Sequence, residues 1–203
     1  MQGCHPRSAS PYGVLSNWNQ TYANRVAEWI FCNRPDLDIT CHIAAIGGSR
    51  CSDLLERFPE VVQPLAPSWT VLTIGTNDAL TDVPVGKFQE QFSTYCEQLR
   101  KHCNGRVLYV GGFLAGPHTD DGNRSALEKC QPYFQKAFEE VRAHGGIALD
   151  VGEALRWRAE KLKEQWPGHS IYSSGVHYNA VGNEIIANQV LVALGLMSLS
   201  GPR

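Results

Sequence analysis

The sequence predicts an α/β protein, a three-layer α/β/α sandwich around a mostly parallel sheet. Two observations lead to this fold class. Strand-like and helix-like segments alternate along the chain, which is typical of βαβ units. The strand-like segments are continuous apolar runs rather than alternating ones, as expected for a parallel sheet that helices cover on both faces.

Four segments are expected to be strands because each is a short apolar run that ends at glycine or at polar residues. The β-branched run Asp38–Ile46 ends at Gly47-Gly48, and Trp69–Ile74 ends at Gly75. The other two expected strands are Arg106–Phe113 and Ile147–Val151.

Six segments are expected to be helices. The first, Thr21–Cys32, places Val26, Trp29 and Ile30 on one face. Ser52 is expected to cap the second. The remaining boundaries follow from apolar periodicity and from glycines, and they give helices over Ser52–Phe58, Lys87–His102, Ser125–His144, Glu153–Trp166 and Val181–Leu196.

Length and composition favour one globular domain spanning residues 1–203, with an atypical N-terminus over 1–11. Hydrophobic residues make up 43% of the chain and charged residues 19%. The net charge of −2 gives no basic footprint for nucleic acid, and no apolar run is long enough to span a membrane. No signal peptide is visible, so a cytoplasmic location is expected, although the N-terminus looks incomplete.

The seven cysteines form no CxxC pair, which disfavours a metal site, and the GxGxxG fingerprint of dinucleotide binding is absent. We therefore expect no metal, no cofactor, and cysteines that are mostly reduced and mostly buried.

Ligands of parallel sheets bind beyond the carboxyl ends of the strands, and three motifs fall where such a site would form. Gly47-Gly48 frees backbone N–H groups, Asn77 offers a neutral amide, and His177 is a base in a loop before a helix. Taken alone, the glycine and asparagine motifs are better explained as ordinary turns, because Gly and Asn are common turn residues, and a single loop histidine is weak evidence of a base.

Together, the three motifs resemble the blocks of the SGNH hydrolases, also called GDSL esterases and lipases. The glycine block is Ile46–Ser49, the asparagine block Gly75-Thr76-Asn77-Asp78, and the histidine block runs over Gly175–Asn183. They occur in the family's order, 29 residues from Gly48 to Asn77 and 100 from Asn77 to His177. The resemblance covers residues 12 to 203.

The resemblance implies a role for each block. The backbone N–H of Gly48 and the side-chain amide of Asn77 would form the oxyanion hole, and His177 would be the base that activates a serine. The family's Asp three residues before the histidine is Ser174 here, which brings no charge to the imidazole. Asp150 is an alternative carboxylate, although its position at a strand end favours capping of the turn.

The nucleophile is the second departure, because no Gly-Asp-Ser is present. Aligning Gly3 with the motif glycine puts His5 at the nucleophile position, and a second alignment puts Pro6 there. We nominate Ser8, the least displaced serine; Ser10 and Cys4 are chemically possible, and a terminus without any catalytic role is the alternative. The family's apolar first strand is also missing, so the resemblance predicts a flavodoxin-like sheet of order 2-1-3-4-5 whose first strand is truncated.

These features predict an ester hydrolase, weakened by its departures, that acts on small acyl esters or acylated sugars. Its partner would be a small-molecule ester, with no nucleic acid and no membrane span. One alternative is a catalytically inactive protein of the same fold that binds a ligand or partner. Another is a different reaction in the same pocket, with Cys4 or His177 as the working group.

Overall fold

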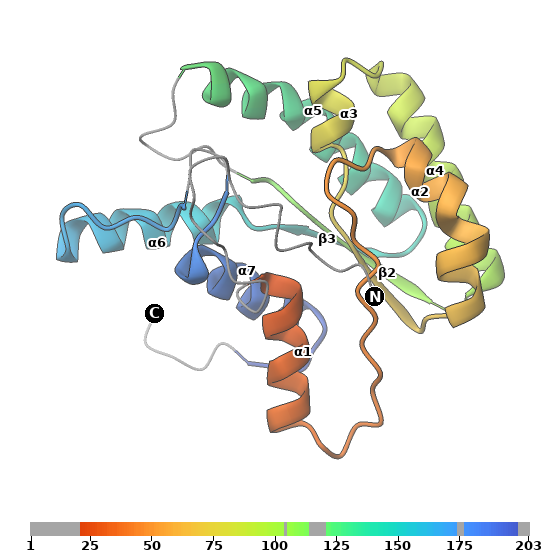
Figure 1. Ribbon diagram of the computed structural model, residues 1–203, viewed down its shortest axis with the longest axis horizontal. Helices are drawn as coiled ribbons and strands as arrows, with labels where there is room; N and C mark the ends of the chain where they lie inside the picture. Colours follow the sequence, from red (N-terminus) through yellow and green to blue (C-terminus); the bar gives the residue numbers. More distant parts are fainter. Residues whose placement is uncertain (1–20, 104, 114–120, 174–176, 199–203) are drawn as a thin grey trace.

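A three-stranded parallel sheet lies at the centre of the protein, as the computed structural model shows (Figure 1). The structure describes residues 21–103, 105–113, 121–173 and 177–198. The strands β1 (Trp69–Leu72), β2 (Arg106–Gly111) and β3 (Ile147–Asp150) are paired in the order β1-β2-β3. This order is the third, fourth and fifth strand of the expected topology.

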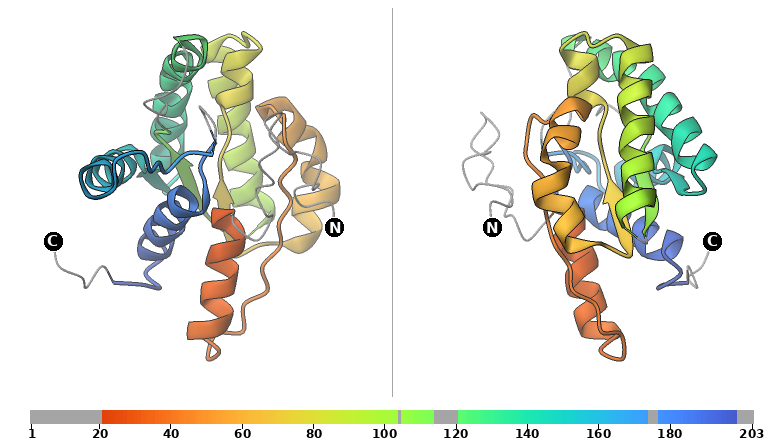
Figure 2. Two further views of the ribbon diagram at one scale, coloured as in Figure 1. Left: turned by 60° about the vertical axis from the view of Figure 1, so that its left-hand side comes forward. Right: turned by 90° about the vertical axis from the view of Figure 1, so that its right-hand side faces the viewer.

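Helices cover both faces of the sheet and confirm the α/β/α layering (Figures 1 and 2). One layer contains α2 (Cys51–Arg57), α3 (Thr76–Leu80), α4 (Val85–His102) and α5 (Asp121–Ala143). The other contains α1 (Tyr22–Asn33), α6 (Gly152–Gln165) and α7 (Ala180–Ala193). A π-helical turn over Phe58–Val62 and a 3₁₀ turn over Gln63–Leu65 extend α2.

Strand β2 belongs to both hydrophobic cores because alternate side chains of a strand point to opposite faces. Val107 and Tyr109 join the core under α4 and α5, and Leu108 and Val110 join the core under α1 and α7. The hydroxyl of Tyr109 donates a hydrogen bond to the carbonyl oxygen of Ile74 at 2.7 Å, which satisfies its one polar group inside the core.

The strand expected over Asp38–Ile46 is wrong: this segment has no regular secondary structure. Figure 1 shows it as the orange coil that leads from α1 to α2. A strand exists only when its backbone pairs with a neighbour, and no described strand pairs with this segment. In the 2-1-3-4-5 order, this segment would pair with the expected truncated first strand. That strand would come from before residue 21 and so lies outside the described residues.

Two smaller expectations also change. Ser52 does not cap α2, because the helix already begins at Cys51 with Arg50 as its N-cap. The side chain of Asp53 instead accepts a hydrogen bond from the Arg50 N–H at 2.8 Å. The asparagine block Gly75-Thr76-Asn77-Asp78, which taken alone favours a turn, leads into the short helix α3 over Thr76–Leu80.

In the part of the chain that the structure describes, no helix has the length and apolar character needed to cross a membrane. The six described cysteines are all free thiols, and four of them are buried.

Candidate active site

Gly48 lies in the loop that leads into α2. Its φ of +83° falls in the left-handed region, which glycine adopts without the strain of a side chain. A Cβ placed there would meet no described atom within 4 Å. Glycine is therefore required for its backbone conformation rather than for space, and the loop faces an open surface of the described protein.

Asn77 lies in the first turn of α3 and points back to the Gly48 loop. Its Nδ2 donates a hydrogen bond to the carbonyl oxygen of Ser49 at 3.1 Å. A carboxamide nitrogen carries two hydrogens, so this bond fixes the side chain and leaves the second hydrogen to donate elsewhere. The glycine and asparagine motifs, 29 residues apart in sequence, therefore meet in space.

Asp78 is a site residue that sequence reasoning did not single out. Its carboxylate is fully buried and accepts the Cys51 N–H through both oxygens, at 3.0 and 3.2 Å. Burial raises the pKa of Asp78 above its ordinary value of 3.8, and the hydrogen bond from Cys51 opposes part of that rise. Asp78 thus ties the start of α2 to α3, and its only sequence signal was its place beside Asn77.

A single guanidinium holds the loop between residues 44 and 49. Arg57 donates to the Ala44 carbonyl oxygen through Nη1 and to Ser49 Oγ through Nη2, each at 3.3 Å. Its Nε also donates to the Asp53 carbonyl oxygen at 3.2 Å. The loop that carries Gly48 is therefore shaped by hydrogen bonds to one side chain of α2.

Cys51 lies close to these groups but is unsuited to act as a nucleophile. Burial raises the pKa of its thiol well above the ordinary value, and the nearby Asp78 adds to the rise. A thiol that stays protonated at neutral pH is a poor nucleophile.

His177 lies in the loop before α7, exposed to solvent. Its carbonyl oxygen accepts the Ser173 N–H at 2.8 Å, beside the antiparallel bridge between Tyr172 and Tyr178. The ring of Tyr178 packs against Phe113, with centroids 6.0 Å apart, and Phe113 lies just beyond the carboxyl end of β2. These contacts place the histidine loop at the carboxyl edge of the sheet.

Tyr22 connects the same edge to β1. Its backbone N–H donates to Asn183 Oδ1 in the first turn of α7 at 3.0 Å. Its hydroxyl shares a 2.8 Å hydrogen bond with the hydroxyl of Thr73, the residue after β1. Burial raises the pKa of the Tyr22 phenol, so the group is neutral at physiological pH.

The structure thus joins Asn77 to the loop that carries Gly48, through Ser49, and places the loop of His177 at the same edge of the sheet. The approach of the His177 ring to Asn77 remains a prediction. Ser8 and Ser174 lie outside the described residues, as do the alternatives Cys4 and Ser10.

Asp150, the alternative carboxylate, caps the turn before α6, as the sequence favours. Its Oδ1 accepts the Gly152 N–H at 2.8 Å. The carboxylate also lies directly against Gly112, where a Cβ would come within 2.0 Å of Oδ1. The side chain is therefore committed to the turn between β3 and α6.

Comparison with known proteins gives a family match over most of the chain. The model of the GDSL-like lipase/acylhydrolase family matches residues 3–185, a range that includes all five nominated site residues. No curated protein matches the chain.

Solved structures with the same fold include a catalytic mutant of Axe2, an acetylxylan esterase from Geobacillus stearothermophilus. It has a TM-score of 0.75 and 18% identity, with 100% of this chain and 91% of that chain covered. LAE5, an α/β hydrolase from the metagenome of Lake Arreo, has a TM-score of 0.71 and 18% identity over 88% and 83% of the two chains. A GDSL-like lipase from Parabacteroides merdae has a TM-score of 0.72 and 17% identity over 87% and 82%. At these identities the likeness establishes the fold alone.

Proposed function

The chain belongs to the GDSL-like lipase/acylhydrolase family, and we propose that it hydrolyses carboxylic esters, either small acyl esters or acylated sugars. One observation carries the proposal: the Asn77 amide is fixed against the Gly48 loop by its 3.1 Å hydrogen bond to Ser49. Donors held in advance near a developing oxyanion do not have to reorganise during the reaction, which is the main source of their catalytic effect.

In the proposed mechanism, the Ser8 hydroxyl attacks the ester carbonyl carbon while His177 takes the hydroxyl proton. The resulting oxyanion is stabilised by the Gly48 N–H and by the second hydrogen of Asn77 Nδ2. The tetrahedral intermediate then expels the alcohol, which receives the proton from His177, and water releases the acyl group by the same steps.

The activity is expected to be weak because Ser174 replaces the family's aspartate. A carboxylate beside the histidine holds the ring in one tautomer and stabilises the imidazolium that forms in the transition state. A serine hydroxyl accepts a hydrogen bond but supplies no charge. In a serine protease, neutralising that aspartate lowers the rate by a factor on the order of 10⁴.

The test is hydrolysis of p-nitrophenyl esters of increasing acyl length, combined with labelling by a serine-directed fluorophosphonate. We expect slow turnover of the acetyl ester and a label that peptide mapping assigns to Ser8, lost in Ser8→Ala and kept in the matched Ser10→Ala. Turnover that survives both Ser8→Ala and His177→Ala would contradict the proposed roles.

The second candidate function is a catalytically inactive protein that binds a ligand through the same edge of the sheet. The specific observation in its favour is the absence of any Gly-Asp-Ser from the sequence together with serine at position 174. Saturable binding of an ester with neither turnover nor fluorophosphonate labelling would select this candidate over the first.

A further inference from the structure

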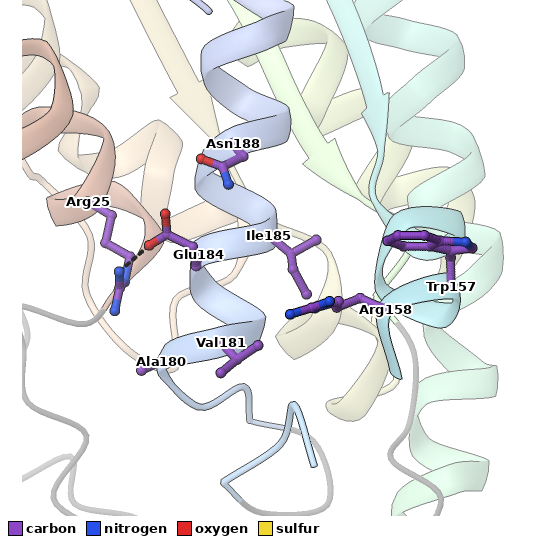
Figure 3. A pocket seen from close by; sticks show the side chains of 8 residues that line it. All are labelled: Arg25, Trp157, Arg158, Ala180, Val181, Glu184, Ile185 and Asn188. Atoms are coloured by element: carbon purple, nitrogen blue, oxygen red, sulfur yellow. Dashed lines mark hydrogen bonds and ion pairs between the residues drawn. The ribbon is translucent and has the colours of Figure 1, made fainter. Parts of the chain in front are cut away.

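A groove of about 530 Å³ lies between α6 and α7 and reaches the first turns of α1 (Figure 3). We refer to it as the α6–α7 groove. A volume of this size is typical of sites for small molecules. Its polar and aromatic lining comes from Arg25, Trp157, Arg158, Glu184 and Asn188.

Among the described residues, the charges that line the α6–α7 groove leave Arg158 without a counter-ion. Glu184 is already paired with Arg25 across α7 and α1. Arg158 extends from α6 towards α7 in Figure 3, and no ion pair forms with it among the described residues. The N-terminal end of α7, which carries no acidic residue in its first turn, adds positive potential at the same place. The groove therefore favours an anionic group at Arg158.

The wall beside Arg158 offers a flat aromatic surface. Trp157 is 54% exposed, which is high for an indole, and its ring extends from α6 towards Ile185 on α7. An exposed aromatic face packs well against the C–H face of a sugar ring, while nearby polar groups bond the hydroxyls. Asn188 on α7 is a further polar group of the lining, on the side of the helix that faces α1 (Figure 3).

The position of the groove links it to the candidate active site. Ala180 and Val181 line it, and they follow His177 by only three and four residues. Three residues of chain span at most about 11 Å, so this end of the groove lies near the histidine loop.

We propose that the α6–α7 groove binds a uronic acid unit of an acylated acidic saccharide, with its carboxylate on Arg158 and its ring face on Trp157. This inference rests on the proposed ester hydrolysis, for which it names the alcohol portion of the substrate. A planar guanidinium recognises a carboxylate through two parallel hydrogen bonds, which gives direction as well as strength.

The test measures binding without catalysis. The probes are an unacylated disaccharide that contains one uronate and the same disaccharide with that carboxyl reduced to an alcohol. Saturation-transfer NMR and calorimetric titration give their dissociation constants with the full chain. We expect the uronate disaccharide to bind about tenfold more tightly than its reduced form, because a hydrogen bond to a charged group contributes roughly that factor.

Matched variants on the same helix assign the effect to the groove. Arg158→Gln should abolish the preference for the uronate, and Arg158→Lys should keep part of it. Arg156→Gln removes an exposed charge two residues away, outside the groove, and should leave the preference intact. Trp157→Ala should weaken both disaccharides about tenfold, whereas Trp166→Ala, whose indole is 52% exposed but lies outside the groove, should not.

The outcomes separate this inference from the proposed function. Ester hydrolysis without binding of either disaccharide would overturn the inference and leave the function standing. Uronate binding that depends on Arg158, with no ester hydrolysis, would support the groove as a saccharide site and contradict the proposed function. Equal binding of the two disaccharides, or concentration-dependent dimerisation lost in Trp157→Ala, would overturn the inference by assigning the groove to a neutral ligand or to a second copy of the chain.

Discussion

Asn77 and Asp78 are adjacent in sequence, but their side chains contact different parts of the protein and have different proposed roles. Asn77 presents a neutral amide next to the Gly48 loop, where a donor that does not titrate is useful over a wide pH range. Asp78 is buried and holds the start of α2 through the Cys51 N–H. One residue therefore serves the proposed chemistry, and the next fixes the two helices that bring the motifs together.

Asn77→Ala should lower kcat for p-nitrophenyl acetate by about 100-fold, because a missing oxyanion donor costs roughly that factor or more in other hydrolases. The unfolding free energy should fall by about 1 kcal/mol as the bond to Ser49 is lost. Steady-state kinetics and urea denaturation measure the two effects. Asn33→Ala removes a comparable hydrogen bond, from Nδ2 to the Trp29 carbonyl oxygen at 2.9 Å at the exposed end of α1, and as the control it should leave kcat unchanged.

Ser174→Asp tests whether the missing charge alone limits the reaction. We expect little or no gain in ester turnover, because a restored carboxylate helps only if a serine near residue 8 already reaches the His177 ring. The measurement is kcat/KM for p-nitrophenyl acetate in both proteins. A large gain from this one substitution would show that the nucleophile is already in place.

Asp78 should make stability depend on pH in a direction opposite to that of most carboxylates. Because burial raises its pKa in the folded state, the neutral form is favoured there, and its contribution is complete below the ordinary value of 3.8. This contribution is lost as the pH rises through the higher folded pKa. In urea denaturation from pH 4 to 7, the wild type should lose unfolding free energy relative to Asp78→Asn; a constant difference would contradict the burial argument.

At the scale of elements, the turn that joins β3 to α6 depends on the contact between Asp150 and Gly112. Gly112 has a φ of +78° and lies directly against the Asp150 carboxylate, which in turn accepts the Gly152 N–H. Two strand ends and one helix start are thus held by a single side chain at the carboxyl edge of the sheet.

Gly112→Ala should lower the unfolding free energy by about 2–3 kcal/mol, because the methyl group displaces Asp150 and the left-handed backbone is strained. Gly145→Ala is a matched control: its φ is +76°, but no atom lies within 4 Å of the added Cβ. It should lose only the conformational part, about 1 kcal/mol. Equal losses in the two variants, measured by urea denaturation, would show that the contact with Asp150 does not matter.

The helices were predictable because a local pattern determines them. The expected Thr21–Cys32 corresponds to α1 over Tyr22–Asn33, with Thr21 as its N-cap. The strand predicted over Asp38–Ile46 was wrong. Its β-branched residues favour a strand, but a strand also needs a paired neighbour, which no local pattern reveals. The same limit applies to the site. Gly48, Asn77 and His177 are visible as motifs, whereas Asp78 and Arg57 act through contacts with residues far along the chain.

At the scale of the whole molecule, the two cores meet at β2, whose residues alternate between them. A strand shared in this way cannot lose one core without weakening the other. If the chain is a single domain, as the sequence predicts, both cores should therefore unfold together in one cooperative transition.

Leu99→Ala, in the core under α4 and α5, and Leu155→Ala, in the core under α1 and α7, should each lower the unfolding free energy by about 2–5 kcal/mol. Both should shift one common thermal transition, seen at the same temperature by far-ultraviolet circular dichroism and by tryptophan fluorescence. Leu80→Ala, an exposed position, should change little. Two separate transitions in either core variant would contradict a single cooperative unit.

The hydrogen bonds that Arg57 donates to the loop between residues 44 and 49 bear on how readily this part of the protein opens. The loop between residues 44 and 49 is held by two hydrogen bonds from the Arg57 guanidinium and one from the Asn77 amide, and nearly all of its residues are exposed. Segments held in this way open by local fluctuation at a much smaller free-energy cost than global unfolding. The Gly48 N–H would then exchange its hydrogen with solvent long before the amides of β2 do. An oxyanion donor would thus be carried by a segment that opens more readily than the core strands.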